Sequence, residues 1–277
     1  MTQPSTRGAM PLNVFVEGIG LLGPGLAGWA QGRQYLDGSL HYEAGRCVLP
    51  LPMALPSAER RRAGAVVRIS MAVGQEAVEA SGLQAKDLPS VFSSSSGDAV
   101  NCHEICAALA SGDRLISPTR FHNSVHNASS GYWSIASGAM ASSSVLCAFD
   151  AGFAAGLLEA MTQCVVDDSP VLLVAYDTEY PEPLYSKRPI PDAMGVALVL
   201  TPRRSARSLA RISLDGTRFL TAAAADTMDD SALETLRQTI PAARALPLLQ
   251  AIAKRDATPV VLAYLDPMQM AVAVAPC

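Results

Sequence analysis

Charged residues are scarce in this chain of 277 residues. Asp, Glu, Lys and Arg make up 17% of it, whereas hydrophobic residues make up 49%. The 21 basic and 25 acidic side chains give a net charge of −4, which provides no electrostatic attraction to nucleic acid or to an acidic membrane surface. We therefore expect neither as a partner. So apolar a composition predicts an unusually large buried interface.

Other absences concern targeting, membranes and metals. Residues 1–8 lack the apolar stretch of a secretory signal, and no later segment offers about 18 uncharged apolar residues in a row. We therefore expect a cytoplasmic protein. The six cysteines are scattered, which predicts reduced thiols. Cys102, His103 and Cys106 alone are a weak metal signal, because a site needs further ligands. We expect no metal and no cofactor.

The apolar pattern predicts alternating strands and helices up to about Thr201. Such alternation is typical of an α/β sheet covered by helices. Residues 20–56 are rich in Gly, Pro and Leu without a clear period, which predicts a long irregular crossing. The helix predicted at 150–163 is apolar almost all round, so it belongs in the middle of a layered fold. Strands are predicted at 13–20, 90–94, 144–148, 170–175 and 194–200, and helices at 59–83, 104–109 and 150–163.

A shorter second part follows a polar, arginine-rich junction after Thr201. It contains a predicted strand at 210–214, a helical region at 229–254, and a strand pair at 259–265 and 269–275. This part is too short to repeat the first. We therefore predict two parts packed on one core, residues 9–201 and residues 202–277.

Several motifs of the first part resemble a β-ketoacyl synthase of the thiolase-like fold. Ile116-Ser117-Pro118 matches the family's ISP segment, and Asn127, Gly131 and Gly138 match its Asn-x3-Gly-x6-Gly pattern. A strand then leads to Asp150, where the family carries the cysteine of its nucleophile elbow. The resemblance covers most of residues 13–201. It implies a layered α/β fold in which the N-terminal ketosynthase half is largely complete and the C-terminal half is truncated.

A narrower resemblance concerns the segment 121–135. Phe121-His122-Asn123-Ser124-Val125-His126-Asn127, followed by Gly131-Tyr132-Trp133-Ser134-Ile135, is similar to the chain-length-factor branch of aryl polyene and xanthomonadin-type pigment clusters. That branch implies a partner subunit, which this segment and the strand ahead of the elbow would face. The residues implied at the interface or acyl tunnel are Phe121, His122, Asn123, His126, Asn127, Tyr132, Trp133 and Cys147.

The departures from the family pattern concern its chemistry. Ketosynthases need a thiolate at the elbow, because it both attacks the acyl thioester and leaves again. Here that position holds Asp150, or Phe149 if the elbow begins one residue earlier, and no histidine follows His126. The resemblance therefore implies a non-catalytic subunit. It would form a heterodimer with an active β-ketoacyl-ACP synthase, through which acyl carrier protein would be reached, and Phe121, Trp133 or Phe149 would limit the acyl tunnel.

Alternatives remain open for several residues. Asp150 could cap a helix N-terminus, or it could be the working carboxylate of a small acyl-thioester decarboxylase or hydrolase. His122 and His126 fit packing and hydrogen bonding at a subunit contact better than a metal site. Asp177 and Glu179 follow a strand and could form an acid/base pair, although loop carboxylates there are commonly solvated. A homodimer that has lost its function is a third reading of the whole chain.

Overall fold

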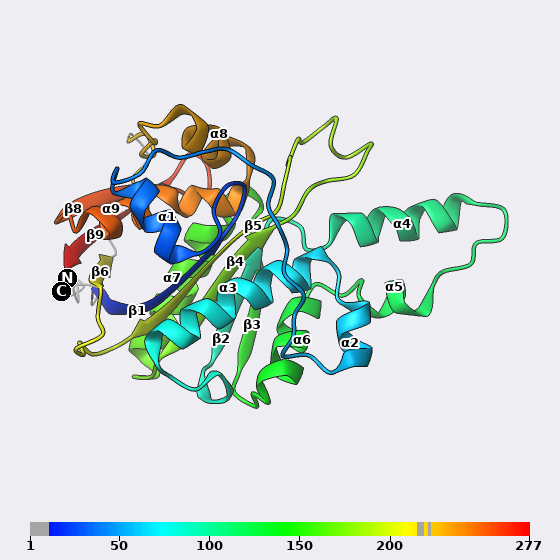
Figure 1. Ribbon diagram of the computed structural model, residues 1–277, viewed down its shortest axis with the longest axis horizontal. Helices are drawn as coiled ribbons and strands as arrows, with labels where there is room; N and C mark the ends of the chain where they lie inside the picture. The colour runs from blue at the N-terminus through cyan, green and yellow to red at the C-terminus, as the bar shows by residue number, and fades with distance from the viewer. Residues whose placement is uncertain (1–10, 215–218, 221–222) are drawn as a thin grey trace, which may run out of the picture.

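The computed structural model describes residues 11–214, 219–220 and 223–277. The polar segment 1–8 and residues 9–10 of the predicted first part lie outside the described residues. The described residues form one mixed sheet in the order β3-β2-β4-β5-β1-β6-β9-β7, with β8 paired to β9 (Figure 1). The strands are β1 (Leu12–Leu22), β2 (Ser90–Ser94), β3 (Ser143–Cys147), β4 (Val171–Asp177), β5 (Met194–Thr201), β6 (Ala210–Leu214), β7 (Phe219–Leu220), β8 (Thr258–Ala263) and β9 (Gln269–Pro276).

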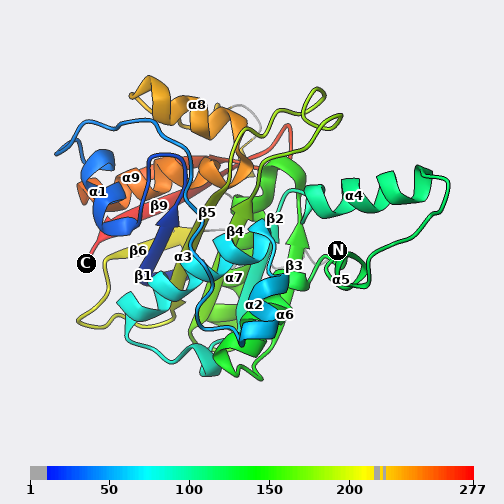
Figure 2. The ribbon, with the colours of Figure 1, turned by 45° about the vertical axis from the view of Figure 1, so that its right-hand side comes forward.

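Helices cover both faces of this sheet. On one face, α3 (Ala65–Ser81) and α6 (Ala128–Ser137) pack against alternate residues of β2, β4 and β5. On the other face lie α7 (Gly152–Val166) and α9 (Leu246–Lys254), with α1 (Trp29–Leu36) and α8 (Ser231–Thr239) beside α9 (Figures 1 and 2). The predicted apolar helix 150–163 is therefore confirmed as α7, which buries most of its surface between the sheet and the second part of the chain.

The long strand β1 joins the two parts of the sheet. It pairs with β5 along residues 15–22 and with β6 along residues 12–16, with an irregularity between Val16 and Gly18. One hydrophobic cluster then extends from Val14 to Val274, so residues from both predicted parts share a core. The division at residues 201 and 202 stays a prediction.

The sequence placed most strands correctly but misplaced several helices. The predicted helix 59–83 is two helices, α2 (Ser57–Arg62) and α3, because the chain is extended at Ala63 and Gly64. The predicted irregular crossing 20–56 contains α1, which buries only Gly32 and Leu36 and so has a weak periodic signal. The predicted helical region 229–254 is interrupted at Ile240 by the turn η3 (Pro241–Ala245).

The segment between β2 and β3 projects from the body of the molecule. Helix α4 (Ala99–Ala110) begins five residues before the predicted 104, at the cap formed by Asp98, and α5 (Pro118–His122) returns toward the sheet. Figures 1 and 2 show these two helices as an arm beside the β3 edge. We call residues 99–122 the arm. Within the part of the chain that the structure describes, no helix is long and apolar enough to cross a membrane.

Candidate functional site

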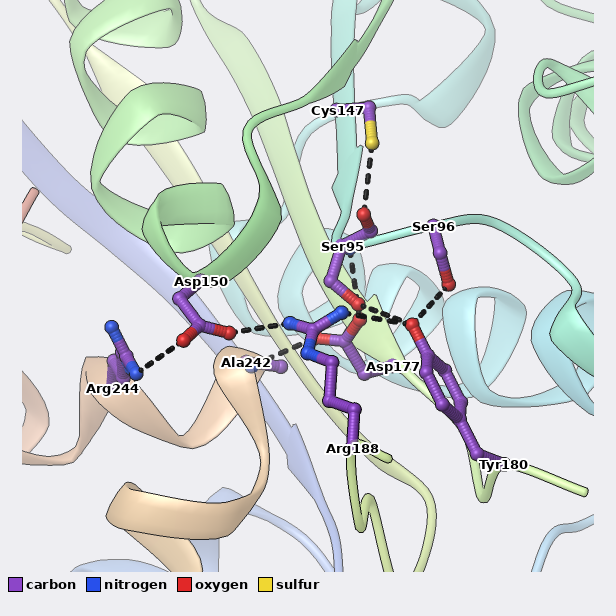
Figure 3. A network of polar contacts seen from close by, with 9 residues as sticks. All are labelled: Ser95, Ser96, Cys147, Asp150, Asp177, Tyr180, Arg188, Ala242 and Arg244. Carbon is purple, nitrogen blue, oxygen red and sulfur yellow. Dashed lines mark hydrogen bonds and ion pairs between the residues drawn. The ribbon is translucent and has the colours of Figure 1, made fainter. Parts of the chain in front are cut away.

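Three parallel strands end at the same edge of the sheet. Strand β2 pairs in parallel with both β3 and β4, so their carboxyl ends meet there. Ser95 follows β2, Cys147 ends β3 and Asp177 ends β4. The turn η2 (Phe149–Ala151) then leads from β3 into α7. The residues at these ends form the network in Figure 3.

Asp150 is held by two arginines from distant parts of the chain. Its Oδ1 accepts a hydrogen bond from Nη2 of Arg188, in the β4–β5 loop, and its Oδ2 accepts one from Nη2 of Arg244 at 2.9 Å, in η3 (Figure 3). The predicted capping role is wrong, because the cap position of α7 is Ala151 and no side chain bonds there. The Asp150 carboxylate instead accepts hydrogen bonds from the two guanidinium groups.

Phe149 occupies the sharp turn between β3 and α7. Its φ of 51° lies in the left-handed region, which is uncommon for a bulky L-residue. The Phe149 side chain is 60% exposed, and the guanidinium carbon of Arg188 lies 3.8 Å from the centroid of its ring. The strained backbone position at the start of α7 is therefore Phe149 rather than Asp150.

Arg188 also reaches the serine-rich turn after β2. Its Nη1 donates to the hydroxyl of Tyr180 at 2.9 Å, and that hydroxyl donates to Oγ of Ser96 at 2.6 Å. Gly97 donates its N–H to Oγ of Ser94 at 2.8 Å, which closes the turn after β2. One guanidinium thus ties the β4–β5 loop to both the β2 and the β3 ends.

Asp177 is the most deeply buried carboxylate of the site, at 4% exposure. Its two oxygens accept the N–H groups of Ser95 and Ala242, each at 2.9 Å. Burial raises the pKa of Asp177 to about 6 despite these hydrogen bonds. Glu179 instead points to the surface and pairs with Arg46 at 2.6 Å. The expectation that both carboxylates are solvated is wrong for Asp177, because it points inward from the end of β4.

Several of the predicted interface residues lie on the surface. Phe121 is 68% exposed, and His122, His126 and Asn127 are also exposed. The Nε2 atom of His126 lies 3.2 Å from the carbonyl oxygen of Leu146. His122 ends α5 whereas His126 precedes α6, so their spacing does not place them on one helix face.

Cys147 also lies at the surface, at the end of β3. Its thiol donates to the carbonyl oxygen of Ser95 at 2.9 Å and points toward that turn rather than toward Asp150 (Figure 3). The alternation of side chains along the strand predicts this direction. Cys147 does not take the place of the missing elbow cysteine.

Tyr132 and Trp133 differ from the other predicted interface residues. Each is 2% exposed. Trp133 packs against Phe92, with ring centroids 6.4 Å apart, and against Gly74 of α3. The Tyr132 hydroxyl donates to Oδ1 of Asn123 at 3.0 Å. Their predicted position at an interface is wrong, because α6 turns both rings into the core between α3 and the sheet.

Sequence reasoning missed both arginine partners of Asp150. Arg188 lies in a polar loop without a motif. Arg244 did carry a signal, since it is the single charged residue in the apolar run 240–253, and a buried charge needs a partner. Within the described residues, no group of three or more His, Cys, Asp or Glu side chains could hold a metal ion.

The fold and this strand-end site define a class of protein with a thiolase-like ketosynthase fold. A model of the family described as "Beta-ketoacyl synthase, N-terminal domain" matches residues 39–261. The chain therefore belongs to the β-ketoacyl synthase family. No curated protein matches it.

Solved structures of ketosynthase complexes share the fold. One is the ketosynthase ApeO in complex with its chain length factor ApeC from Xenorhabdus doucetiae, at 21% identity and a TM-score of 0.66, covering 94% of this chain and 99% of that one. Another is the ishigamide ketosynthase/chain length factor, at 11% identity, a TM-score of 0.68, and 95% and 99% coverage. The third is the AntDE:AntF complex of a type II ketosynthase with its acyl-carrier protein, at 13% identity, a TM-score of 0.71, and 97% and 100% coverage.

Proposed function

We propose that this chain is a non-catalytic chain-length factor. It forms a heterodimer with an active β-ketoacyl-ACP synthase and shapes the acyl tunnel of that enzyme in the biosynthesis of an aryl polyene-type product. The observation that carries the proposal is the identity of the residues at the elbow between β3 and α7. Phe149 adopts the strained backbone conformation there, and Asp150 is bound by two guanidinium groups. Neither side chain can accept and release an acyl group as a thiolate does.

The same contacts weigh against the alternative function, an acyl-thioester decarboxylase or hydrolase that uses Asp150. A carboxylate that acts as base or nucleophile needs an oxygen that can reach the substrate. Here Oδ1 accepts from Arg188 and Oδ2 accepts from Arg244. Charge-assisted bonds of this kind are the strong ones, so breaking them would add to the barrier of any reaction at Asp150.

Strand β3 provides a surface for the partner. It is the outermost strand of the described sheet on its side and pairs with β2 alone. The Ser90 N–H donates to the carbonyl of Ser142 at 3.0 Å. Because successive residues of a strand point their backbone groups to opposite sides, those of Ser143, Val145 and Cys147 point away from β2. Such an unpaired edge is a template for another strand.

Exposed apolar side chains flank this edge. Met140 is 95% exposed just before β3, and Phe121 and Phe149 are 68% and 60% exposed on either side of the strand in sequence. The arm adds Leu109 and Leu115, which are 49% and 75% exposed. Apolar surface gathered around an open strand edge is typical of an interaction site. We assign this surface to the active ketosynthase subunit, because two of the similar solved structures contain a ketosynthase together with a chain length factor.

Phe121 and Phe149 are the residues that we assign to limiting the acyl tunnel. Both rings remain accessible in the chain. Trp133, the third predicted candidate, is enclosed by its own chain and cannot reach a partner's tunnel. Acyl carrier protein would meet the complex through the active subunit.

The proposal is tested at the β3 edge by co-expression with the ketosynthase encoded beside this chain. Val145→Pro removes an outward N–H without breaking a hydrogen bond to β2, and one lost hydrogen bond costs about 1 kcal/mol, or about fivefold in affinity. Val145→Ala is the matched control, because it also shortens the side chain but keeps the N–H. We expect the proline variant alone to weaken co-purification. If neither the wild type nor the alanine variant co-purifies with the ketosynthase, the heterodimer is ruled out.

A further inference from the structure

Two factors determine the position of the Phe149 ring, namely the backbone conformation of Phe149 and one neighbouring side chain. A left-handed backbone conformation is uncommon for a bulky L-residue. At this position φ is 51° and the side chain is 60% exposed. The ring is therefore a fixed feature of the surface beside the β3 edge only if something holds it there.

Arg188 is the neighbour that covers the ring. Its guanidinium carbon lies 3.8 Å from the ring centroid, close enough for a cation–π interaction. Arg188 comes from the β4–β5 loop, so its position is set independently of the turn that carries Phe149. The ring is thus clamped from outside its own segment.

The guanidinium itself is held in one orientation. Nη1 donates to the Tyr180 hydroxyl at 2.9 Å, and Nη2 donates to Asp150. Asp150 is fixed in turn by Arg244 at 2.9 Å, and Tyr180 by Ser96 at 2.6 Å (Figure 3). The Arg188 side chain is 21% exposed, so the planar group has little freedom to turn. A planar guanidinium group whose two Nη atoms both donate hydrogen bonds is a rigid surface against which an aromatic ring can pack.

We infer that Arg188 is a positioning residue, which fixes the Phe149 ring as a rigid wall and thereby sets the length of the acyl chain that the heterodimer accepts. This inference rests on the proposed function. The Phe149 side chain remains 60% exposed beside Arg188, and its apolar aromatic surface suits an extended apolar or conjugated acyl chain. If the Phe149 ring were free to rotate, longer acyl chains would fit. Arg188 and Phe149 together therefore set the maximum length of the acyl chain.

The first test observes the ring directly and does not require a partner. The chain is labelled with 4-fluorophenylalanine at its six phenylalanines, and the Phe149 signal is identified by its loss in Phe149→Leu. Arg188→Met keeps an apolar stem but removes the guanidinium. We expect the fluorine resonance of Phe149 to shift more than the other five in this variant. Arg203→Met is the matched control, because Arg203 forms an exposed pair with Asp168. An unmoved Phe149 resonance in Arg188→Met overturns the inference.

The second test measures products made by the co-expressed complex with malonyl carrier protein. We expect both Phe149→Leu and Arg188→Met to lengthen the main product by one or more extension units, while Arg203→Met leaves it unchanged. If Phe149→Leu lengthens the product and Arg188→Met does not, the positioning role of Arg188 is overturned. If Phe149→Leu has no effect in a complex that forms normally, the assignment of Phe149 to the tunnel in the proposed function fails instead.

A double variant separates the clamp from the charge pair. Arg188→Met leaves Asp150 with Arg244 alone, which could loosen η2. Adding Asp150→Asn removes the remaining Asp150–Arg244 ion pair while the ring still lacks its cation. We expect the longer product to persist in Asp150→Asn/Arg188→Met. A return to the wild-type product length would assign the effect to the altered Asp150 ion pair and overturn the inference.

Discussion

Asp177 shows how a single side chain joins segments that lie far apart in the chain. It ends β4, yet it accepts the N–H of Ser95 after β2 and the N–H of Ala242 in η3. Burial destabilises the charged form of a carboxylate, and it raises the pKa of Asp177 to about 6 although the charge of Arg188 lowers it. This residue therefore makes the stability of the chain depend on pH.

The pH dependence follows from the two pKa values of Asp177, about 3.9 when unfolded and about 6 when folded. Its stabilising contribution is complete below about pH 4 and is lost as the pH rises to about 6, because the unfolded chain releases the proton first. We expect the free energy of unfolding of the wild type to fall by about 2 kcal/mol relative to Asp177→Asn over this interval. Urea unfolding at several pH values measures the difference, and parallel curves for the two proteins would contradict it.

Residue-scale features divide by whether their cause is local. The sequence alone shows that the elbow lacks a cysteine and that no histidine follows His126. The environment of Asp150 is not, because its partners Arg188 and Arg244 lie 38 and 94 positions away. The periodicity of a sequence does not show which distant side chains pair. The sequence therefore favoured a helix cap for Asp150, whereas the structure pairs Asp150 with two arginines.

At the scale of elements, β1 and α3 approach each other closely. A Cβ atom on Gly18 would lie 1.9 Å from the carbonyl oxygen of Ala77, and one on Gly20 would lie 1.9 Å from that of Val73. The two glycines therefore let helix α3 lie directly on the strand backbone. Their spacing places both on the same face of β1.

Gly20→Ala tests this close approach. The added methyl group would meet backbone that cannot move without shifting α3, so we expect a loss of about 3 kcal/mol in the free energy of unfolding. Gly112→Ala is the matched control, because a Cβ there meets no atom within 4 Å, and we expect its effect to stay within about 0.5 kcal/mol. Denaturant unfolding of both variants gives the comparison. Equal stability of the two would mean that α3 can slide on β1.

Most strands were predictable from their apolar residues, whereas several short helices were not. The buried strands β4 and β5 are continuous apolar runs, and the predicted 170–175 and 194–200 match them closely. Helices α5 and α6 were not predicted, because they follow each other through short polar turns. The inward rotation of α6 that buries Trp133 depends on Gly74 of α3, which leaves room for the indole ring.

At the scale of the whole molecule, the arm is apolar and yet largely exposed. Of the twelve residues of α4, Ala99 and Asn101 are buried. A helix that is rich in Ala, Ile, Leu and Cys gains little by facing water. The predicted large buried interface is consistent with this arm lying against the proposed ketosynthase partner.

Serine substitutions on the arm should separate association from folding. Leu109→Ser and Leu115→Ser remove apolar surface that is already exposed, so we expect the free energy of unfolding of the isolated chain to change by less than about 0.5 kcal/mol. Burying a leucine against a partner contributes about 1.5 to 3 kcal/mol, so each variant should bind the ketosynthase about tenfold or more weakly.

The control for this measurement is Val166→Ser. Val166 is 73% exposed at the far end of α7, away from the strand carboxyl ends. Titration of labelled chain with the purified ketosynthase gives the dissociation constants. An arm variant that binds as tightly as Val166→Ser would place the arm outside the interface.

The sequence by itself determined the alternation of strands and helices, the apolar helix at the centre of the layers and the missing thiol and imidazole groups. Each of these features depends on residues that are close together in the sequence. The spacing of apolar residues predicts the strands and helices, and the residue type at a motif position shows which reactive groups are missing. The tertiary structure alone decided that Phe149 takes the strained turn, that two arginines hold Asp150, that Asp177 is buried and that Tyr132 and Trp133 face inward. Those outcomes depend on segments far apart in the chain being brought to one sheet edge, and no local pattern encodes which side chains meet there.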